Sequence, residues 1–183
     1  MGSDNKRRPF LRQNEPSLGE LMSVTLREMT KDEFAAFWQW SIRQQAQELA
    51  HQQHITAEAA CKAAAEELSQ MLPQGQSTPG NRLFSVVEAQ SGECVGFLWT
   101  LHEEANGVKQ SFLCDFAIWE GKRRRGYGEA ALCMAQLLEA QAGCRESVLF
   151  VSNDNAGARA LYEKCGYAFL RAHGYGSYMR KQL

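Results

Sequence analysis

The apolar and polar positions divide the chain into a segment without a period, a helical segment, and a segment in which strands and helices mix. Residues 1–21 are polar and aperiodic. From Val24 to about Met71 the apolar spacing is first strand-like and then helical. From Leu83 onward, β-branched and aromatic runs alternate with turns and with two further helical stretches. This pattern predicts one folded domain at 23–183, preceded by a tail at 1–22.

Local signals set the limits of the predicted elements. Thr30-Lys31-Asp32-Glu33 has the form of a capping box, and Thr56 can cap a second helix. Proline and glycine in 72–80 end that second helix, and Gly143 can cap a later one. The predicted elements are a strand at Val24–Arg27, helices from Thr30 to about Gln52 and from Thr56 to about Met71, strands at Leu83–Ala89, Cys94–Leu101 and Lys109–Ile118, a helix ending near Ala142, a strand at Ser147–Ser152, a helix at Asn155–Cys165, and strands at Tyr167–Ala172 and Tyr175–Lys181.

The order of these elements, β-α-α-β-β-β-α-β-α-β-β, predicts an α/β domain with a mixed sheet. Turns at 90–93 and 105–107 favour hairpins between neighbouring strands, so the sheet differs from a regularly alternating, doubly wound one. The tail at 1–22 is interpreted as disordered or non-native, or as the result of an over-long start-site assignment. No function is assigned to it.

Composition and charge narrow the function. The formal net charge of -1 argues against a general nucleic-acid binder, which needs a basic face. Six cysteines are scattered without a CxxC pair or metal-ligand spacing, which favours a reduced, cytoplasmic protein. No apolar run approaches the length of a membrane span. His51 and His54 lack a third ligand at useful spacing, so we expect no metal and no membrane or nucleic-acid partner.

Basic charge is concentrated in one loop, Lys122–Arg125, directly before Gly126-Tyr127-Gly128 and a run of strong helix formers. An apolar strand ends just upstream, so a strand, a basic glycine loop and a helix follow one another. Glycine allows a ligand to approach the backbone, and the amides at a helix start point outward at the positive end of the dipole. This arrangement predicts a site for a phosphate or pyrophosphate.

Three families of glycine loop compete for this stretch. A nucleotide P-loop requires Gly-Lys-Ser/Thr, which the chain lacks. The dinucleotide fingerprint is formally matched by Gly126–Ala131, and Glu146 lies about twenty residues on. However, Glu146 begins its predicted strand instead of ending it, and a long basic link separates strand from glycine. An NAD(P)-binding oxidoreductase is therefore kept as the less favoured alternative.

The third family is identified by two motifs in order. Arg123-Arg124-Arg125-Gly126-Tyr127-Gly128 resembles the Arg/Gln-x-x-Gly-x-Gly/Ala cofactor motif of the GNAT (GCN5-related) N-acetyltransferases. Their second signature is matched by Asn155, Ala158, Leu161, Tyr162, Lys164, Gly166 and Tyr167. The resemblance covers about Ser23 to Leu183. The helical insert and the loop after it are similar to a bacterial subgroup that includes YycN-type proteins, although Trp119-Glu120 stands where the family usually has a proline.

The resemblance implies a GNAT fold, with a mixed and mostly antiparallel sheet flanked by helices, and acetyl-CoA as the acyl donor. In this family the donor lies in a V between the fourth and fifth strands. The residues expected to hold it, by backbone or side chain, are Phe116, Ala117, Ile118, Arg123, Arg124, Arg125, Gly126, Tyr127, Gly128, Glu129, Ala130, Asn155 and Tyr162.

Acetyl transfer to an amine requires a neutral amine, a polarised carbonyl and a stabilised thiolate. A backbone amide at Phe116 or Ile118 is the candidate for polarising the carbonyl. Tyr162 is the candidate donor to the thiolate, with core packing as the alternative. Asp115 is the only charge in its apolar run, and a buried carboxylate must be paired or shifted in pKa. It is the candidate base, with a structural hydrogen bond as the alternative, and Glu104 is a third catalytic candidate.

The acceptor is left open by the sequence. A protein N-terminus, a lysine or a small amine would each fit, in a monomer or a homodimer. Phe37, Trp38 and Trp40 could line an acceptor pocket, although core packing is favoured for at least two of them. Cys114 and Cys165 lack an accompanying histidine, so direct attack by the amine is preferred over a cysteine intermediate. A non-catalytic acyl-CoA sensor on the same fold is the second hypothesis.

Overall fold

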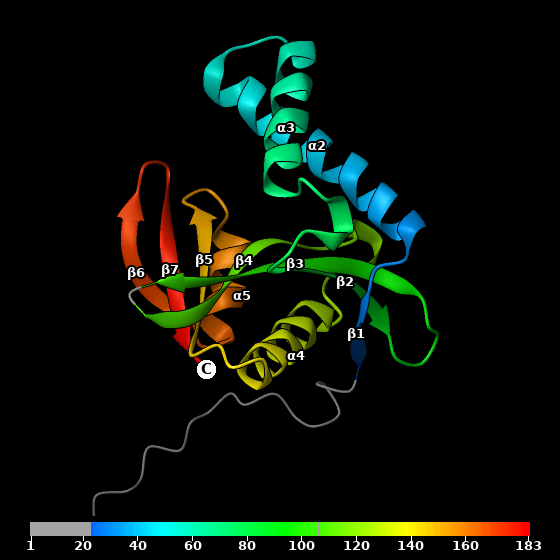
Figure 1. The fold of residues 1–183 in the computed structure, drawn as a ribbon, viewed down its shortest axis with the longest axis vertical. Helices are drawn as coiled ribbons and strands as arrows, with labels where there is room; N and C mark the ends of the chain where they lie inside the picture. Colours follow the sequence, from blue (N-terminus) through cyan, green and yellow to red (C-terminus); the bar gives the residue numbers. More distant parts are fainter. Residues whose placement is uncertain (1–22, 106) are drawn as a thin grey trace, which may run out of the picture.

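The computed structural model describes residues 23–105 and 107–183, and there the elements follow the predicted order (Figure 1). Residues 1–22, predicted to be a tail, and Asn106 of a predicted turn lie outside the described residues. The elements are β1 (Val24–Glu28), α2 (Lys31–Gln53), α3 (Ala57–Met71), β2 (Asn81–Glu88), β3 (Cys94–Ala105), β4 (Val108–Ile118), α4 (Tyr127–Gln141), β5 (Glu146–Ser152), α5 (Ala156–Lys164), β6 (Ala168–His173) and β7 (Gly176–Gln182). In the described part of the chain, no helix is both long enough and apolar enough to cross a bilayer.

The described strands form one seven-stranded sheet in the order β1-β2-β3-β4-β5-β7-β6. Strands β4 and β5 are parallel, and every other neighbouring pair is antiparallel. The predicted mixed, mostly antiparallel sheet is therefore confirmed. The one parallel pair requires a crossover, which α4 provides.

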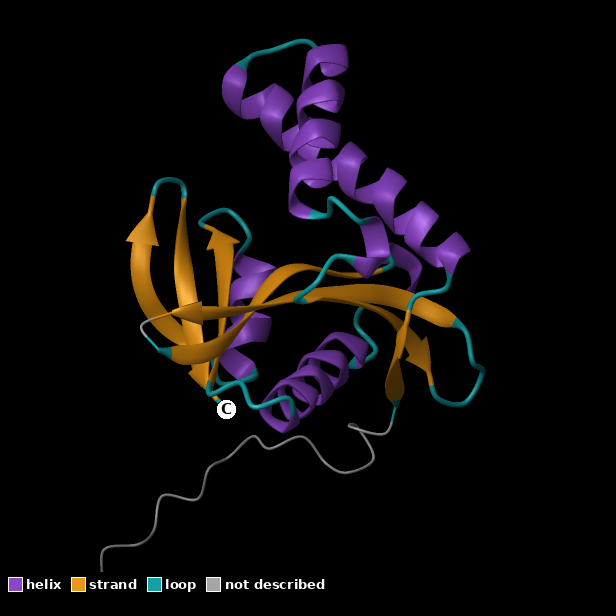
Figure 2. Ribbon diagram, in the orientation of Figure 1, coloured by secondary structure: helices purple, strands orange, loops and turns teal. Residues whose placement is uncertain are grey.

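Helices cover both faces of the sheet, with α2 and α3 on one side and α4 and α5 on the other (Figure 2). The alternation along β3 accounts for the two layers, because successive side chains of a strand point to opposite faces. Leu98 enters the core under α4, whereas Phe97 and Trp99 enter the core under α2. The sheet is thus buried on both faces at its centre.

The aromatic residues of α2 pack against this second face. Phe37 is 2% exposed, and its ring centroid lies 4.9 Å from that of Phe97. Trp40 contacts Phe97 at the same centroid distance, and Trp38 packs on Phe34. Core packing, the favoured alternative for these side chains, is what the structure shows.

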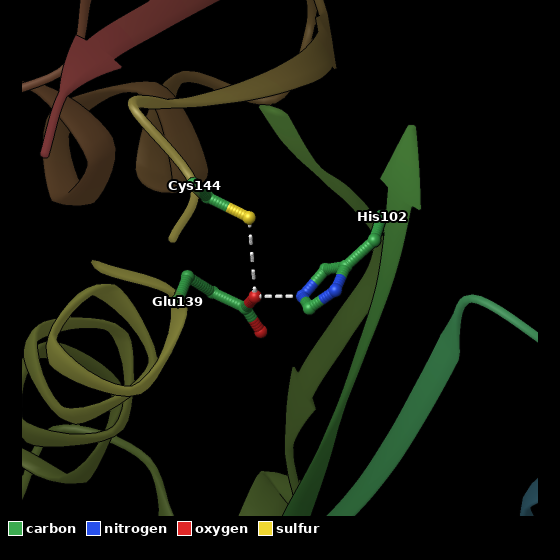
Figure 3. A group of neighbouring side chains, drawn as sticks. All are labelled: His102, Glu139 and Cys144. Carbon is green, nitrogen blue, oxygen red and sulfur yellow. Dashed lines mark hydrogen bonds and ion pairs between the residues drawn. The ribbon is translucent and has the colours of Figure 1, made fainter. Parts of the chain in front are cut away.

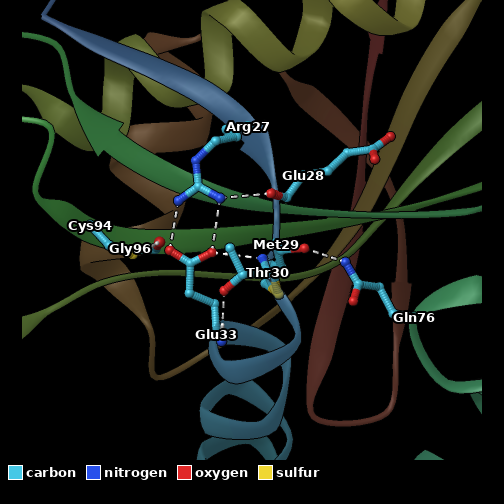
Figure 4. Close-up of polar contacts among 8 residues, drawn as sticks. All are labelled: Arg27, Glu28, Met29, Thr30, Glu33, Gln76, Cys94 and Gly96. Atoms are coloured by element: carbon cyan, nitrogen blue, oxygen red, sulfur yellow. Dashed lines mark hydrogen bonds and ion pairs between the residues drawn. The ribbon is translucent and has the colours of Figure 1, made fainter.

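The start of α2 is fixed by the capping box that the sequence predicts (Figure 4). The Glu33 amide donates to Thr30 Oγ1 at 3.2 Å, and the Thr30 amide donates to Glu33 Oε2 at 2.8 Å. The guanidinium of Arg27 adds a 2.7 Å ion pair to Glu33 Oε1. This hydrogen-bonded cation holds the pKa of Glu33 down, at about 2. The Glu33 carboxylate at the start of α2 is therefore ionised at neutral pH, and both of its oxygens are paired.

Thr30→Ala should lower the free energy of unfolding by about 1 kcal/mol, because the Glu33 amide loses its side-chain acceptor. The expected decrease in Tm is a few degrees. Thermal denaturation followed by circular dichroism measures it, with Thr30→Ser, which keeps the hydroxyl, as the control. Equal Tm values for all three proteins would show that the cap does not stabilise α2.

Helix α4 is anchored on β2 and β3 by a buried carboxylate, Glu139, whose side chain is 2% exposed. One oxygen accepts from Thr100 Oγ1 at 2.9 Å and from Arg82 Nη1 at 3.3 Å. The other contacts the His102 ring and, at 3.9 Å, the Cys144 thiol, and Figure 3 shows both side chains directed at it. Because both oxygens are engaged by protein groups, we interpret the cluster as the anchor of α4.

Candidate active site

The sheet opens between β4 and β5. The two strands pair only over Gln110–Leu113 and Glu146–Leu149, and beyond these residues they have no register partners on the facing sides. Strand β5 stays paired to β7 along its whole length, and β4 stays paired to β3 to its end. The backbone edges of the last halves of β4 and β5 therefore face a gap in the middle of the sheet.

A bulge in β4 coincides with the start of this gap. Trp99 of β3 pairs with Asp115 and Thr100 pairs with Leu113, so Cys114 is the extra residue. Bulges bend the strand that carries them and increase its twist. The bend turns the end of β4 away from β5. The sequence predicts a regular strand here, because a bulge depends on register and not on local composition.

A pocket of about 250 Å³ fills the gap. It is lined by β4, β5 and α5 together with single residues from elsewhere: Glu48, Leu113, Cys114, Asp115, Phe116, Phe150, Val151, Ser152, Asn155, Ala158, Tyr162 and Tyr175. The structure thus brings together Asp115, Phe116, Asn155 and Tyr162, four of the residues that the sequence predicts for the site.

The backbone of β4 presents alternate residues to the gap. The Trp119 amide donates to the Val95 carbonyl of β3, which makes this a hydrogen-bonded pair of the ladder. By alternation, Phe116 and Ile118 occupy non-hydrogen-bonded positions, so their polar groups point away from β3. Ala117 faces β3 and is not brought to the gap. The Phe116 amide donates to Asp115 and the Ile118 carbonyl accepts from Arg123, so the Phe116 carbonyl and the Ile118 amide are the backbone groups left for a ligand.

The basic loop at the end of β4, Arg124–Gly126, is the predicted anion cradle. Arg124 has φ +62° and Gly126 has φ +82°, whereas Arg125 between them has negative φ. Alternation of this kind turns successive amides toward one concave side. Gly126 is the N-cap residue of α4, and no side chain caps that helix. Its first amides therefore have no side-chain cap, at the place where the sequence predicts an anion site.

The three arginines of the loop differ in their contacts. Arg123 Nε donates to the Ile118 carbonyl at 2.9 Å, which ties the loop to the end of β4. Arg125 Nη2 lies 3.5 Å from the Gly121 carbonyl, and Arg124 is exposed. Arg123 thus has a structural contact that the sequence does not predict, and all three charges remain beside the cradle.

The two glycines of the loop have different surroundings. A Cβ at Gly126 would meet no heavy atom within 4 Å, whereas a Cβ at Gly128 would lie 3.2 Å from Leu161 Cδ2. Gly126 thus leaves open space at the cradle, and Gly128 allows α4 to pack closely on α5. The side chains of Tyr127 and Glu129 are bound to Glu88 and Lys164, so these residues offer backbone amides only.

Asp115 is held from both sides at the pocket. The Phe116 amide donates to Oδ1 at 2.8 Å, and Ser41 Oγ of α2 donates to Oδ2 at 3.3 Å. Burial nevertheless raises the pKa of Asp115 to about 6, and the nearby Glu48 carboxylate contributes to this shift. Asp115 therefore has both the structural hydrogen bonds and the intermediate pKa that a base requires.

Tyr162 lies across the pocket on α5, 9% exposed, with its ring 5.9 Å from that of Tyr167. Burial raises the pKa of Tyr162 well above that of a free tyrosine, and the negative charge of Asp115 adds to the effect. Its hydroxyl is therefore a proton-bearing donor at any physiological pH. Asn155 caps α5 by accepting from the Ala158 amide at 3.1 Å, as the safer of its two predicted roles requires.

The model of the acetyltransferase (GNAT) family matches residues 27–167, which include the cradle, Asp115 and Tyr162. The chain belongs to the GNAT family. Enzymes of this family are acetyl-CoA-dependent N-acetyltransferases, as the two motifs imply. The fold, the family and the class of enzyme predicted from the sequence are all confirmed.

Relatives and solved structures agree with this assignment. The chain is 28% identical to the uncharacterized N-acetyltransferase YdgE of Bacillus subtilis over 162 residues, which cover 88% of this chain and 99% of that protein. The crystal structure of YycN, a putative acetyltransferase of the same organism, superposes with a TM-score of 0.75 at 26% identity, over 82% of this chain and 96% of YycN. The predicted YycN-like subgroup is thus supported. The PaiA N-acetyltransferase of Thermoplasma acidophilum, solved with coenzyme A, shares the fold at a TM-score of 0.64 and 16% identity, over 88% of this chain and 99% of that one.

The GNAT topology separates Glu104 from the other predicted residues. Glu104 is exposed and pairs in register with Lys109, near the tip of the β3–β4 hairpin. Asp115 lies six residues farther along β4, which corresponds to roughly 20 Å of strand. Glu146 of the dinucleotide alternative begins β5, at the opposite end of the parallel pair from the cradle. The NAD(P) alternative is therefore not favoured.

A second pocket of about 380 Å³ adjoins the first and shares Glu48 and Ser152 with it. It is also lined by Gln44, Gln47, His51 and Asp154, so it lies between α2 and the end of β5.

Sequence reasoning missed Ser41, Glu48 and the aromatic wall of Phe150 and Tyr175. The spacing of Ser41, Gln44, Glu48 and His51 on α2 places them along one helix face, and this polar stripe is the signal that could have found them.

Proposed function

We propose that this GNAT enzyme transfers the acetyl group of acetyl-CoA directly to a primary amine, in a cytoplasmic setting. The observation that carries the proposal is the pocket between the splayed strands, where Tyr162 and Asp115 face the same space beside the anion cradle. The transfer requires a proton donor and a proton acceptor. Both line the pocket that the pantetheine arm of acetyl-CoA would reach along β4.

The described residues offer groups for both the pyrophosphate and the pantetheine arm of acetyl-CoA. The cradle of Arg124–Gly126 and the first amides of α4 would hold the pyrophosphate, with Arg124 and Arg125 adding charge. The open space at Gly126 accommodates a close approach to the backbone. The Phe116 carbonyl, which points away from β3, would accept from a pantetheine amide as it would from a neighbouring strand. When bound, acetyl-CoA supplies an acetyl thioester to the pocket.

The transfer itself depends on two side chains. Tyr162 would donate its hydroxyl hydrogen to the departing thiolate, and its raised pKa keeps that hydrogen in place until it is needed. Asp115 would accept the proton of the acceptor nitrogen, directly or through water, since this nitrogen becomes acidic once it has attacked the carbonyl. Because the Phe116 amide already donates to Asp115, the Ile118 amide would polarise the carbonyl.

The acceptor would enter through the pocket between α2 and the end of β5. Glu48 lines both pockets and carries a negative charge beside Asp115, which suits an amine that arrives protonated. A protein N-terminus, a lysine side chain and a small amine all present such a group. The acceptor is the part of the proposal that requires a screen.

Thermal-shift and thiol-release assays test the proposal together. We expect acetyl-CoA and coenzyme A to raise the Tm and NAD(P) to leave it unchanged. Primary amines should then release coenzyme A from acetyl-CoA, whereas quaternary analogues of the same charge should not. Stabilisation by NAD(P) alone would contradict the donor, and binding without release across the library would instead indicate an acyl-CoA sensor.

The pKa of Asp115 predicts the low-pH limb of the activity. Because the base must be ionised, kcat/KM should rise with pH and level off above about 6. Asp115→Asn should lower kcat/KM and remove this limb. A pH–rate profile of both proteins measures it, and an unchanged limb in Asp115→Asn would assign the titration to another group.

The raised pKa of Asp115 also predicts that ionisation of this carboxyl group, which activity requires, destabilises the folded protein. The folded pKa of Asp115 is raised from 3.8, so stability is lost as pH rises through about 6. Asp115→Asn should remove this cost and raise the free energy of unfolding at pH 7 by on the order of 1–3 kcal/mol. A variant that is less active and also less stable would instead indicate a purely structural role.

A further inference from the structure

The hairpin between β2 and β3 lies at the end of the sheet where β4 runs into the anion cradle. Gly96, near the start of β3, pairs in register with Ile118 at the end of β4. A Cβ at Gly96 would collide with the Ala117 carbonyl oxygen, so glycine lets the two strands approach closely here. The hairpin residues 88–93 are thereby brought to the loop 122–127, which they contact at two points.

Two side-chain contacts join the hairpin to this loop. Glu93 Oε2 accepts from Lys122 Nζ at 2.5 Å. Glu88 Oε1 accepts from the hydroxyl of Tyr127, the first residue of α4. Lys122 precedes the two positive-φ residues of the cradle, and Tyr127 follows them. The hairpin thus holds the turn of the cradle on both sides.

The Glu88 carboxylate has a fixed orientation. Ser91 Oγ donates to Oε2 at 2.5 Å, and the Tyr127 hydroxyl donates to Oε1. The backbone closes the hairpin, because the Glu88 amide donates to the Glu93 carbonyl and the Gly92 amide donates to the Glu88 carbonyl, each at 2.9 Å. The hydrogen bonds from Ser91 and Tyr127 hold the pKa of Glu88 below its ordinary value. Glu88 is therefore an ionised acceptor, held on both oxygens.

Tyr127 connects Glu88 to the backbone of the cradle. Its side chain is 7% exposed and packs in the core under α4, so its ring and its backbone are held together. Its own amide is one of the first amides of α4, which have no side-chain cap. Converging amides repel one another until an anion binds, and a positive φ is costly for a residue such as Arg124. Such a geometry persists only where the surrounding structure imposes it.

We propose that Glu88 is a positioning residue for the acyl donor, a role that rests on the proposed function. Through Tyr127 it holds the cradle in the shape that receives the pyrophosphate of acetyl-CoA. The negative charge of Glu88 would by itself repel this anion. The contribution of Glu88 is therefore the hydrogen bond that it accepts, which organises the cradle before the donor arrives.

Isothermal titration of the full chain with coenzyme A tests the proposal, with variants on both sides of the contact. We expect Glu88→Ala and Tyr127→Phe each to weaken binding about tenfold, because each loses the same hydrogen bond. The double variant should bind no more weakly than either single variant. Glu88→Gln keeps an oxygen acceptor without the charge, so it should bind within about threefold of the wild type.

Steady-state kinetics separate positioning from a loss of the fold. Neither Glu88 nor Tyr127 lines the pocket of the reacting groups, so their variants should raise the KM for acetyl-CoA and keep kcat. Thr100→Val is the matched control, since it removes a 2.9 Å hydrogen bond to Glu139 near the opposite end of the same helix. We expect this control to lower the Tm and to leave the affinity for coenzyme A unchanged.

Three outcomes would overturn this inference and leave the proposed function standing. They are an unchanged affinity in Tyr127→Phe, losses that add in the double variant, and an equal loss of affinity in Thr100→Val. The last would assign the effect to the general stability of α4. A wild-type protein that does not bind coenzyme A would instead remove the proposed function, and this inference with it. Tyr127→Phe keeps the ring and carries the test if Glu88→Ala does not fold.

Discussion

Tyr162→Phe should lower kcat about 10²–10³-fold while the KM for acetyl-CoA changes little, because the lost hydroxyl acts on the departing thiolate and not on the bound donor. The ring stays in place, since its burial and its contact with Tyr167 do not depend on the oxygen. Steady-state kinetics with the acceptor found by screening measure both constants.

Tyr167→Phe is the matched control for this variant. Its hydroxyl is 2.7 Å from Ser147 Oγ, inside the core and outside the pocket lining. We expect this variant to lose stability and to keep its kcat within a few-fold. A kcat that falls equally in both variants, or not at all in Tyr162→Phe, would remove Tyr162 from the mechanism.

Gly126→Val should weaken acetyl-CoA binding by at least about 50-fold, because a branched side chain would fill the cradle and two or more charge-assisted amide contacts would be lost. The native φ of +82° also strains any side chain at this position. Isothermal titration with acetyl-CoA measures the affinity.

Gly143→Val separates the loss of binding from this strain. Gly143 has φ +88°, and a Cβ there would also meet nothing within 4 Å, but it lies after the C-terminal end of α4. The two variants should lose similar stability, and only Gly126→Val should lose affinity. Similar affinities in the two variants would show that the cradle does not hold the donor.

Much of the fold could be predicted because its signals are local. The capping box at Thr30, the turns between strands, and the glycine after each late helix each depend on neighbouring residues. The element order followed from them, and the two motifs around Gly126 and Asn155 identified the family. Their spacing also indicated that the cradle and Tyr162 belong to one site.

The remaining features depend on register and topology, which are not local. The bulge at Cys114 sets where β4 leaves β5, and nothing in the run Phe112–Ile118 marks it. Glu104 was selected because it ends a strand, but the hairpin places it far from Asp115. Ser41 reaches Asp115 across 74 positions of sequence, so only its place on a polar helix face could have indicated it.

The central claim is that the acetyl group passes directly from coenzyme A to a primary amine. Mass spectrometry of the full reaction, with acetyl-CoA, the enzyme and a primary-amine library, tests it most directly. We predict an amine that gains one acetyl group for each coenzyme A released, and a protein without an acetyl adduct when no amine is present. An acetylated cysteine on the protein, or acetyl-CoA binding with no acetylated amine from any class, would contradict the account.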